Sequence, residues 1–317
     1  MEFATGSAAA PFIASYGYRV HNVVRAPVPF VSKGRIIFSA LWYLNYWLEY
    51  RHSRSEMVRL IEEMKPELIV GDEEFSSVSI ALEKGYKHAM ITDERELGFA
   101  RTYVAKKIEG RVLEWFENLQ RTVSCLIVPD FGTDEDNIRY VTPVVRDVTM
   151  RRDETLALHG LPRDSRLITV SISGSGLGAH LIEAATSAFN RARLDGTTMA
   201  VVGGNTRASH EDNVFHLGSV RDNQNLIAAS RLVISLAGKS TIDESNSYGV
   251  PIIAIPLKNH FEQERNAKIL GFSYNDINRL DSLITDAIER PQHPRNYGGS
   301  SAAAQVLADI ARGAQAA

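Results

Sequence analysis

The chain has little of the residues that build covalent or metal cross-links. Cys125 is the single cysteine among 317 residues, which excludes an internal disulfide and a cysteine-rich metal site. It lies beside the apolar run 126–128, and no neighbouring residue indicates an activated thiol. We therefore expect a small buried side chain rather than a nucleophile.

Long apolar runs and an excess of charge are also absent. No run of about 18 apolar residues occurs, and the N-terminal residues lack the basic and apolar regions of a signal peptide, so we expect a cytoplasmic protein. Lys and Arg number 35 and Asp and Glu 38, a formal net charge of −3. This balance gives no electrostatic reason to expect nucleic acid as a partner.

The length and the 44% hydrophobic content predict two medium domains with real cores. A stretch without helical or strand periodicity, 143–150, separates the halves and is the expected hinge. We assign 1–146 to a first domain and 147–300 to a second. Residues 301–317 form a C-terminal helix that in this arrangement could return to the first domain, although a frayed tail is the alternative.

Short apolar and β-branched runs alternate with helical stretches through the second half, which predicts an α/β fold with a parallel sheet. The expected strands are 167–172, 197–202, 213–217, 232–236 and 252–256.

One stretch, 232–270, places polar residues after two of these strands. Gly238 and Lys239-Ser240-Thr241 follow the first strand and can cap a helix, whose N-terminus stabilises an anion. Glu244 comes one turn later. Because parallel strands end at the same edge of a sheet, we expect one crevice to hold these residues together with the helix start that follows the next strand. That helix start carries Glu262, Gln263 and Asn266.

A glycine-rich loop follows the strand 167–172. Small residues let backbone N–H groups approach phosphate oxygens, so we assign the loop to binding. The G-x-G-x-G spacing differs from the G-x-G-x-x-G of NAD enzymes, and the next strand ends at Gly203 without a ribose-binding acid. His180 could reach the same anion or be a solvated residue of the first helical turn. The loop residues assigned to binding are Gly174, Ser175, Gly176 and Gly178.

These motifs resemble the donor half of the MurG-like family 28 glycosyltransferases. The resemblance implies a GT-B fold, with two Rossmann-like domains whose parallel sheets face each other across a cleft. By match, Glu244 would bind the ribose hydroxyls and residues 238–241 would face the diphosphate. Glu262, Gln263 and Asn266 belong to the sugar-reading segment, and Ser219 with Val220 would lie beside the base. Some relatives carry His or Arg where this chain has Leu236, which leaves the phosphates to Lys239 or to backbone amides.

By the same resemblance, residues 1–24 correspond to the second βα unit of the first domain. The first βα unit of the resembled domain, whose glycine-rich loop ends in a histidine, has no counterpart in this sequence. Either the chain is shortened relative to its relatives, or its N-terminal sheet starts one strand late. His21 lies inside a predicted strand and does not replace that histidine.

An acidic run after the strand 67–70 supplies the first candidates for the catalytic base. Asp72, Glu73 and Glu74 stand at a strand C-terminus, where a carboxylate with a raised pKa could deprotonate an acceptor hydroxyl. The alternative is that they cap the next helix and complement its dipole. Residues 93–96, Asp-Glu-Arg-Glu, form a second acidic cluster.

A predicted helix at 35–64 is rich in aromatic residues. They could pack within the protein, or they could form a groove or interfacial patch for a lipid-linked acceptor, with Arg51 and Arg54 for anionic headgroups. The aromatic residues are Phe38, Trp42, Tyr43, Tyr46, Trp47 and Tyr50.

The resemblance implies a hexosyltransferase that moves a sugar, expected to be N-acetylglucosamine, from a UDP-sugar to an acceptor hydroxyl. The acceptor could be lipid-linked or a cell-envelope glycan, which would bring peripheral contact with the inner membrane face. No cofactor is expected, and no metal is required because the second half lacks a D-x-D motif. A nucleotide-sugar hydrolase or epimerase, or an inactive binding subunit, are the alternatives.

Overall fold

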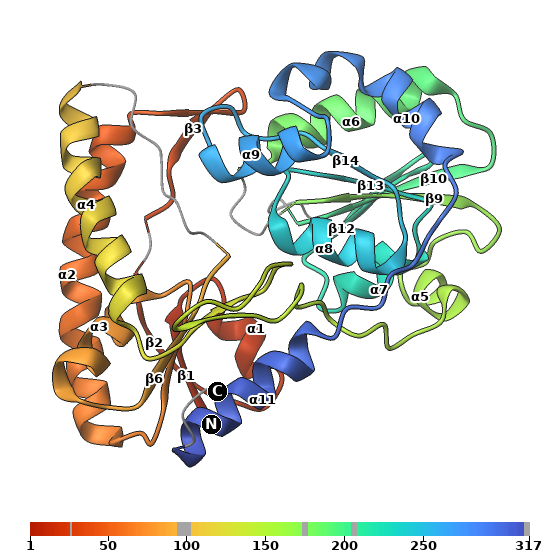
Figure 1. Ribbon diagram of the computed structural model, residues 1–317. Coiled ribbons are helices and arrows are strands. Elements are labelled where there is room, and N and C mark those ends of the chain that lie inside the picture. Colours follow the sequence, from red (N-terminus) through yellow and green to blue (C-terminus); the bar gives the residue numbers. More distant parts are fainter. Residues whose placement is uncertain (26, 94–102, 173–176, 204–207, 314–317) are drawn as a thin grey trace. The chain divides into compact units, whose positions relative to one another are not determined.

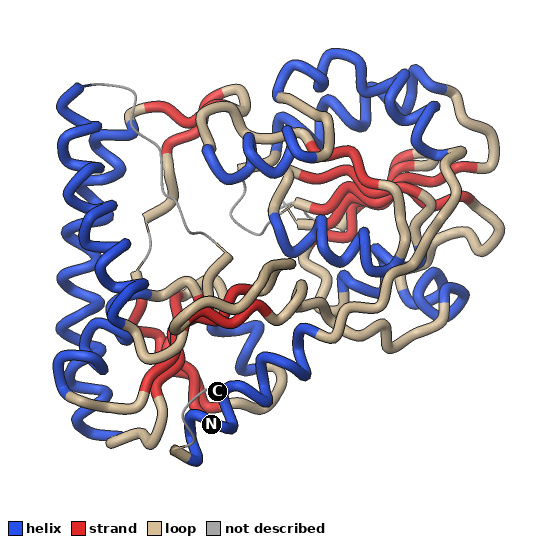
Figure 2. Tube along the Cα trace, viewed as in Figure 1, coloured by secondary structure: helices blue, strands red, loops and turns tan. Residues whose placement is uncertain are grey.

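The computed structural model describes the chain except for residues 26, 94–102, 173–176, 204–207 and 314–317. It divides into two compact units, each built of helices around parallel strands (Figure 2). The predicted ranges 1–146 and 147–300 differ from this division at residues 31–37 and 145–146, which belong to the second unit, and at residues 298–300, which belong to the first. The first unit comprises Met1–Phe30, Phe38–Val144 and Gly298–Ala317, and the second comprises Val31–Ile37 and Val145–Tyr297.

The second unit contains a six-stranded sheet in the order β11-β12-β10-β9-β13-β14. Strand β11 is antiparallel to its neighbour and the other pairs are parallel. The strand order reverses between β9 and β13, which is the topological switch point where ligands bind in open α/β sheets. The strands are β9 (Arg166–Ser171), β10 (Thr197–Val202), β11 (Ser209–Glu211), β12 (Val214–Gly218), β13 (Leu232–Ser235) and β14 (Ile252–Ala254).

Helices cover both faces of this sheet, with α6 and α10 on one face and α5, α7 and α8 on the other (Figure 1). Alternate residues of β9 point to opposite cores, as the two-residue period of a strand requires. Ile168 and Val170 pack in the core that includes α6 and α10, whereas Leu167 packs with α5 and α7. The helices are α5 (Arg152–Leu158), α6 (Ala179–Ala192), α7 (Asn223–Ala229), α8 (Lys239–Tyr248), α9 (Phe261–Ile269), the 3-10 helix η1 (Tyr274–Arg279) and α10 (Leu280–Ile288).

A hairpin from the N-terminal half belongs to the second unit. Strands β3 (Phe30–Ser32) and β4 (Arg35–Ile37) flank a turn at Lys33 and Gly34, whose φ angles are 46° and 69°. The amide of Ile36 donates to the carbonyl of Lys258 at 3.0 Å, and the amide of Lys258 donates to the carbonyl of Gly34 at 2.8 Å. The prediction that a helix begins at residue 35 was therefore wrong, because the extended chain here pairs with the second unit.

The first unit contains a parallel pair, β1-β2, and a four-stranded parallel sheet in the order β5-β6-β7-β8. Phe116 of α4 is fully buried against the four-stranded sheet together with Val78 of α3 and Met90 of β6. The elements are β1 (Glu2–Gly6), α1 (Ala10–Ala14), β2 (Arg19–Val24), α2 (Ser39–Met64), β5 (Ile69–Asp72), α3 (Phe75–Lys84), β6 (His88–Ile91), α4 (Tyr103–Thr122), β7 (Leu126–Val128) and β8 (Ile138–Tyr140).

The last helix, α11 (Gly299–Arg312), belongs to the first unit. Its buried Ala303 lies in a core cluster with Ile127 and Cys125. Cys125 is 1% exposed, which confirms the expectation of a small buried side chain. A Cβ on Gly299 would overlap the carbonyl oxygen of Thr142, so the helix start lies directly against the chain that ends the sheet.

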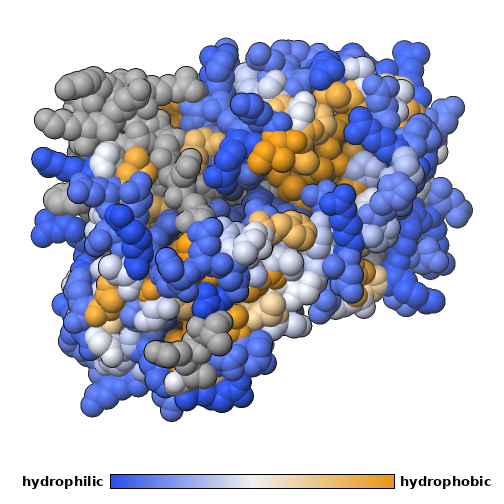
Figure 3. Space-filling view, in the orientation of Figure 1, coloured by the Kyte–Doolittle hydropathy of each residue, from blue (hydrophilic) through white to orange (hydrophobic). Residues whose placement is uncertain are grey.

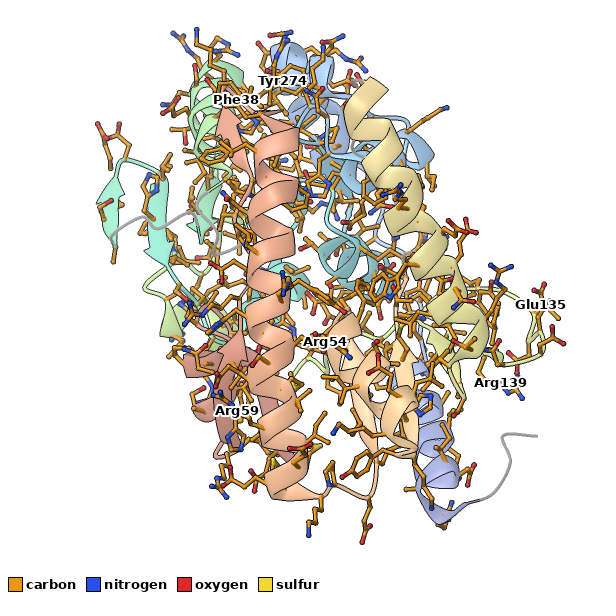
Figure 4. All side chains as sticks on the ribbon, turned by 90° about the vertical axis from the view of Figure 1, so that its left-hand side faces the viewer. Phe38, Arg54, Arg59, Glu135, Arg139 and Tyr274 are labelled. Carbon is orange, nitrogen blue, oxygen red and sulfur yellow. The ribbon has the colours of Figure 1, made fainter. Side chains whose placement is uncertain are left out.

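Part of the aromatic helix α2 packs inside the first unit. The indole of Trp42 donates to the carbonyl of Pro27 at 2.7 Å, and the ring of Tyr50 meets that of Trp115 edge to face. Arg54, considered for lipid headgroups, forms an ion pair with Glu83 of α3 (Figure 4). The side chains of Tyr43, Tyr46 and Trp47 lie outside the described part.

Other residues of α2 are exposed. Phe38, the N-cap of α2, is 68% exposed, and Leu41 and Leu48 within the helix are each about half exposed. Among the described residues, no helix combines the length and the apolar character needed to span a bilayer. Hydrophilic side chains are spread over the visible face of both units, with an apolar area on the second (Figure 3).

Candidate functional site

The predicted donor loops follow the two strands at the switch point. Ser171 at the end of β9 and Ser235 at the end of β13 are register partners, so both loops start side by side. Gly174, Ser175 and Gly176 lie outside the described residues. The last glycine of the loop, Gly178, is the N-cap of α6, and a Cβ there would overlap the side chain of Ile172. Gly178 therefore packs directly against Ile172, the residue that follows β9.

The loop after β13 turns sharply into α8. Ala237 has a φ of 62°, and Gly238 is the N-cap without a side-chain cap hydrogen bond. The prediction that Lys239-Ser240-Thr241 caps the helix was wrong, because these residues are already helical. The first backbone N–H groups of any α-helix lack partners within the helix, so the start of α8 still presents donors suited to an anion.

Lys239 has a carboxylate partner in its own helix. Its Nζ lies 2.7 Å from Oδ2 of Asp243, which is 8% exposed. The i,i+4 spacing places both side chains on the same helix face. The backbone donors of α8, rather than this ammonium group, are therefore the better candidates for a diphosphate.

Glu244 lies in the second turn of α8 and is 4% exposed. Its two carboxylate oxygens accept hydrogen bonds from Arg146, from Nε to Oε1 at 2.7 Å and from a terminal guanidinium nitrogen to Oε2 at 3.1 Å. Sequence reasoning missed Arg146, which lies in the segment between the two halves. Arg146 lies almost 100 residues from Glu244, so no periodic pattern in the sequence relates the two residues. The only local signal is that Arg146 lies in a stretch without helical or strand periodicity.

Helix α9 brings the predicted sugar-reading residues to the loops that follow β13 and β14. The amide nitrogen of Asn266 donates to the carbonyl of Ala237 at 3.2 Å, and the residue is 6% exposed. Oε1 of Gln263 accepts from the amide of Leu257 at 2.9 Å. Glu262 lies in the first turn and is half-buried. Asn266 and Gln263 therefore also hold the shapes of the two loops.

The loop after β12 carries Ser219 and Val220. Ser219 is exposed, and Val220 packs against the core cluster that contains Leu226 of α7. At the start of α7, the amide nitrogen of Asn223 donates to the hydroxyl of Ser171 at 2.9 Å. This bond ties the start of α7 to the end of β9, beside the switch point.

His180, in the first turn of α6, packs against the hairpin. A Cβ on Gly34 would overlap its ring, and the side chain is half-buried rather than solvated as one expectation had it. Burial lowers the pKa of His180, with hydrogen bonding at Leu177 and the charge of Glu183 opposing the shift. The ring is therefore favoured as neutral near pH 7, which weakens it as an anion ligand.

The first unit brings Glu73 of the first acidic run next to Asp93, the first residue of the second run. Asp72 ends β5, and Oε1 of Glu73 accepts from the backbone amide of Asp93, which follows β6, at 3.1 Å. Removal from water raises the pKa of Glu73 to about 7; hydrogen bonding with Thr92 opposes this shift and the charge of Asp93 adds to it. The pKa of Asp72 is also raised, by burial and then by Asp93. Glu94 and Glu96 lie outside the described residues.

Glu74 has a different role from its neighbours. It is the N-cap of α3, and its carboxylate accepts from the amides of Ser76 and Ser77, both at 2.9 Å. This is the capping role that the sequence left open, and each carboxylate oxygen accepts a backbone hydrogen bond. Capping favours Asp72 and Glu73 over Glu74 as base candidates.

The comparison with known families falls on the same part of the chain. Residues 170–286 match the model of the glycosyltransferase family 28 C-terminal domain. This part of the second unit is therefore similar to a family 28 C-terminal domain. The matched range runs from β9 through α10 and contains the switch-point loops and Glu244.

Two glycosyltransferase relatives extend this likeness. An uncharacterized glycosyltransferase of Methanopyrus kandleri is 25% identical over 51% of this chain and 48% of its own length. One of Methanosarcina acetivorans is 23% identical over 68% of this chain and 60% of its own. The chain thus spans between about half and three fifths of the length of these relatives.

The structure of spinosyn rhamnosyltransferase SpnG complexed with thymidine diphosphate has a TM-score of 0.60 at 15% identity, covering 99% of this chain and 96% of that one. Together with the two parallel-stranded units, this likeness shows that the fold is α/β of the two-domain GT-B type. Among the described residues, no group of three or more His, Cys, Asp or Glu side chains is placed to hold a metal ion.

Proposed function

We propose that this chain is a glycosyltransferase that takes a hexose from a nucleoside diphosphate sugar. The observation that carries the proposal is the buried Glu244, one turn inside α8 and next to the switch point, within the range that matches the family 28 domain. A buried carboxylate needs hydrogen-bond donors, and in this structure Arg146 supplies one to each oxygen of Glu244. The vicinal hydroxyls of a ribose are donors of this kind, and the amides at the start of α8 suit the diphosphate that is attached to it.

The reaction would be a direct displacement at the anomeric carbon. An acceptor hydroxyl loses its proton to a carboxylate of the first unit, and its oxygen bonds to the anomeric carbon while the bond from that carbon to the diphosphate oxygen breaks. Backbone N–H groups at the starts of α6 and α8 stabilise the departing diphosphate, so no metal ion is required. With a pKa of about 7, Glu73 is the better base of the two candidates near neutral pH.

The finer assignments follow from the family likeness. UDP-N-acetylglucosamine is the proposed donor, with Glu262, Gln263 and Asn266 near the sugar and Ser219 and Val220 near the base. The acceptor would be a hydroxyl of a lipid-linked or cell-envelope glycan, reached from the inner face of a membrane. The exposed Phe38, Leu41 and Leu48 of α2 support such contact.

Calorimetric titration of the full chain tests the donor site. UDP-N-acetylglucosamine and UDP should bind in preference to GDP and NAD. Glu244→Ala should weaken UDP binding by about 1–3 kcal/mol, the cost of leaving polar ligand groups unpaired. Glu289→Ala is the matched control, because this carboxylate also pairs with an arginine of the second unit, Arg166, but is largely exposed. Its binding should equal that of the unaltered protein.

A folded chain that binds none of the nucleotides would contradict the donor assignment. Product analysis then separates the alternatives on the same site. Conversion of the UDP-sugar without any acceptor would indicate a hydrolase or epimerase, and binding without turnover over a panel of acceptors would indicate a binding subunit.

A further inference from the structure

Arg146 and Glu244 form a two-pronged ion pair. The Nε and a terminal nitrogen of the guanidinium donate to different carboxylate oxygens of Glu244, at 2.7 and 3.1 Å. In such a pair the two hydrogen bonds run parallel, so the guanidinium takes the lone-pair positions of the two oxygens that face the same way. The positions that remain point away from each other. Two hydroxyls on adjacent carbon atoms therefore cannot both donate to this carboxylate while the arginine is in place.

The two partners of this pair differ in their exposure to water. The side chain of Glu244, in α8, is 6% exposed, whereas that of Arg146, in the segment before α5, is 42% exposed. The arginine therefore covers the carboxylate from the solvent side. A ligand that approaches Glu244 from water has to replace the guanidinium before it can bond to both oxygens.

The main chain of Arg146 is anchored independently of its guanidinium. The hydroxyl of Tyr248, in α8, donates to the carbonyl of Arg146 at 2.6 Å. Three residues later, the amide of Thr149 donates to Oδ1 of Asn225, in α7, at 2.9 Å, and Asn225 is 2% exposed. Neither bond involves the guanidinium. The side chain can therefore leave Glu244 by rotation about its own bonds while the segment keeps its place on the two helices.

We propose that the guanidinium of Arg146 is an internal plug of the donor site, an autoinhibitory contact that the ribose of the nucleotide has to displace. The inference rests on the proposed function, because it takes Glu244 as the ribose ligand. Binding then exchanges two hydrogen bonds for two: the 2′ and 3′ hydroxyls donate to the oxygens that the guanidinium leaves, and the guanidinium is hydrated. The closed pair thereby holds the affinity for a ribonucleotide below that of the open site. A nucleotide without these hydroxyls gains nothing when the pair opens.

Calorimetry of the full chain with UDP and with 2′,3′-dideoxy-UDP tests the plug. Arg146→Ala should raise the affinity for UDP relative to that for the dideoxy nucleotide by about tenfold, the effect of one charge-assisted hydrogen bond that no longer has to be broken. The ratio of the two affinities is the decisive quantity, because the loss of a positive charge acts equally on both diphosphates. Arg146→Lys, which donates from a single nitrogen, should give a smaller increase in this ratio.

Chemical modification of Arg146 in the unaltered protein gives a readout that a merely structural ion pair would not move. Phenylglyoxal reacts with guanidinium groups, and mass spectrometry of the peptides follows Arg146 alone. Saturating UDP should accelerate the modification, because the guanidinium leaves Glu244 for water, whereas 2′,3′-dideoxy-UDP should not. Slower modification in the presence of UDP would mean that Arg146 contacts the bound nucleotide, and this result overturns the plug.

Arg166→Ala is the matched control, since it removes the arginine of an exposed pair with Glu289 in the same unit. It should leave both affinities unchanged. If Arg146→Ala does not fold, Arg146→Lys and Arg146→Gln decide the ratio. A ratio that the Arg146 substitutions leave unchanged or lower overturns the inference while the proposed function stands. Folded proteins that bind neither nucleotide, with or without Arg146, are a failure of the proposed function, and the inference fails with it.

Discussion

Gly34 and His180 lie so close that no side chain fits between them. A Cβ at Gly34 would overlap the imidazole ring of His180, and the φ of +69° at Gly34 is itself unfavourable for other residues. The contact joins the turn of the hairpin to the first turn of α6, which follows the glycine loop. The N-terminal half thereby supplies packing for the part of the second unit that we assign to phosphate binding.

Gly34→Ala should destabilise the second unit by about 2–4 kcal/mol, from backbone strain and steric overlap together. Gly160→Ala is the matched control, because Gly160 has a φ of +65° and no atom lies within 4 Å of the place that an added methyl group would take. It should cost about 1 kcal/mol. Urea denaturation measures both. Equal losses of stability in the two variants would mean that the hairpin does not pack tightly against α6. Combining Gly34→Ala with His180→Ala should recover the part of the loss that comes from steric overlap.

Glu73 should make both stability and activity depend on pH. Its pKa is raised from 4.5 to about 7, so between these values the folded chain holds a proton that the unfolded chain has released. The stabilising effect of that proton is present below about pH 4.5 and is lost as pH rises through 7. The stability of Glu73→Gln relative to that of the unaltered protein should therefore be greater at pH 8 than at pH 5. Thermal melting of both proteins at the two pH values measures this difference.

Activity should change in the opposite sense. A base must be deprotonated, so turnover should rise as pH increases through about 7, and Glu73→Gln should lose this rise together with most of the rate. A Glu73→Gln enzyme with the original pH profile would transfer the role to Asp72 or to another group.

Glu74→Ala should affect stability rather than chemistry. It removes the acceptor for the amides of Ser76 and Ser77 at the start of α3, a loss of about 1 kcal/mol by comparison with other N-caps. Turnover per folded molecule should remain within about twofold of the original. Glu74→Asp, which keeps a capping oxygen, should recover part of the stability, and a large loss of turnover in a folded Glu74→Ala would return Glu74 to the base candidates.

Cys125 should resist thiol reagents until the first unit unfolds. It is 1% exposed, and burial raises the pKa of its thiol, so both access and the thiolate fraction are low. Modification by iodoacetamide at pH 8 should be at least about tenfold slower in the native protein than in urea. Fast native labelling would show that the core of Ile127 and Ala303 opens readily.

The second unit was predictable because its strands are buried on both faces. Runs such as 167–172 and 197–202 are continuous in β-branched and apolar residues, a pattern that helix covering on both sides of a sheet produces. The expected strand 197–202 agrees with β10 at both ends. Gly178 and Glu244 could be placed near the starts of α6 and α8 for the same reason, since each stands at a fixed distance after such a strand.

Pairings between distant segments were not predictable from local pattern. Residues 35–37 were predicted to start a long helix, because the neighbouring sequence carries no sign that the amide of Ile36 bonds to the carbonyl of Lys258. Arg146 was missed on the same physical ground. The sequence placed Glu73 and Glu74 together as base candidates. Only the backbone geometry distinguishes their roles, because Glu73 has a φ of 50° and Glu74 is the N-cap of α3.

The hairpin at residues 31–37 also has a consequence for the order in which the chain folds during synthesis. It leaves the ribosome long before Lys258, the residue whose backbone it pairs with. At typical elongation rates this delay is on the order of ten to forty seconds. The first unit waits longer still, because α11, which packs in the core around Cys125, is made after Lys258. Neither unit is a continuous stretch of the chain, so each reaches its final packing only after its last segment has emerged.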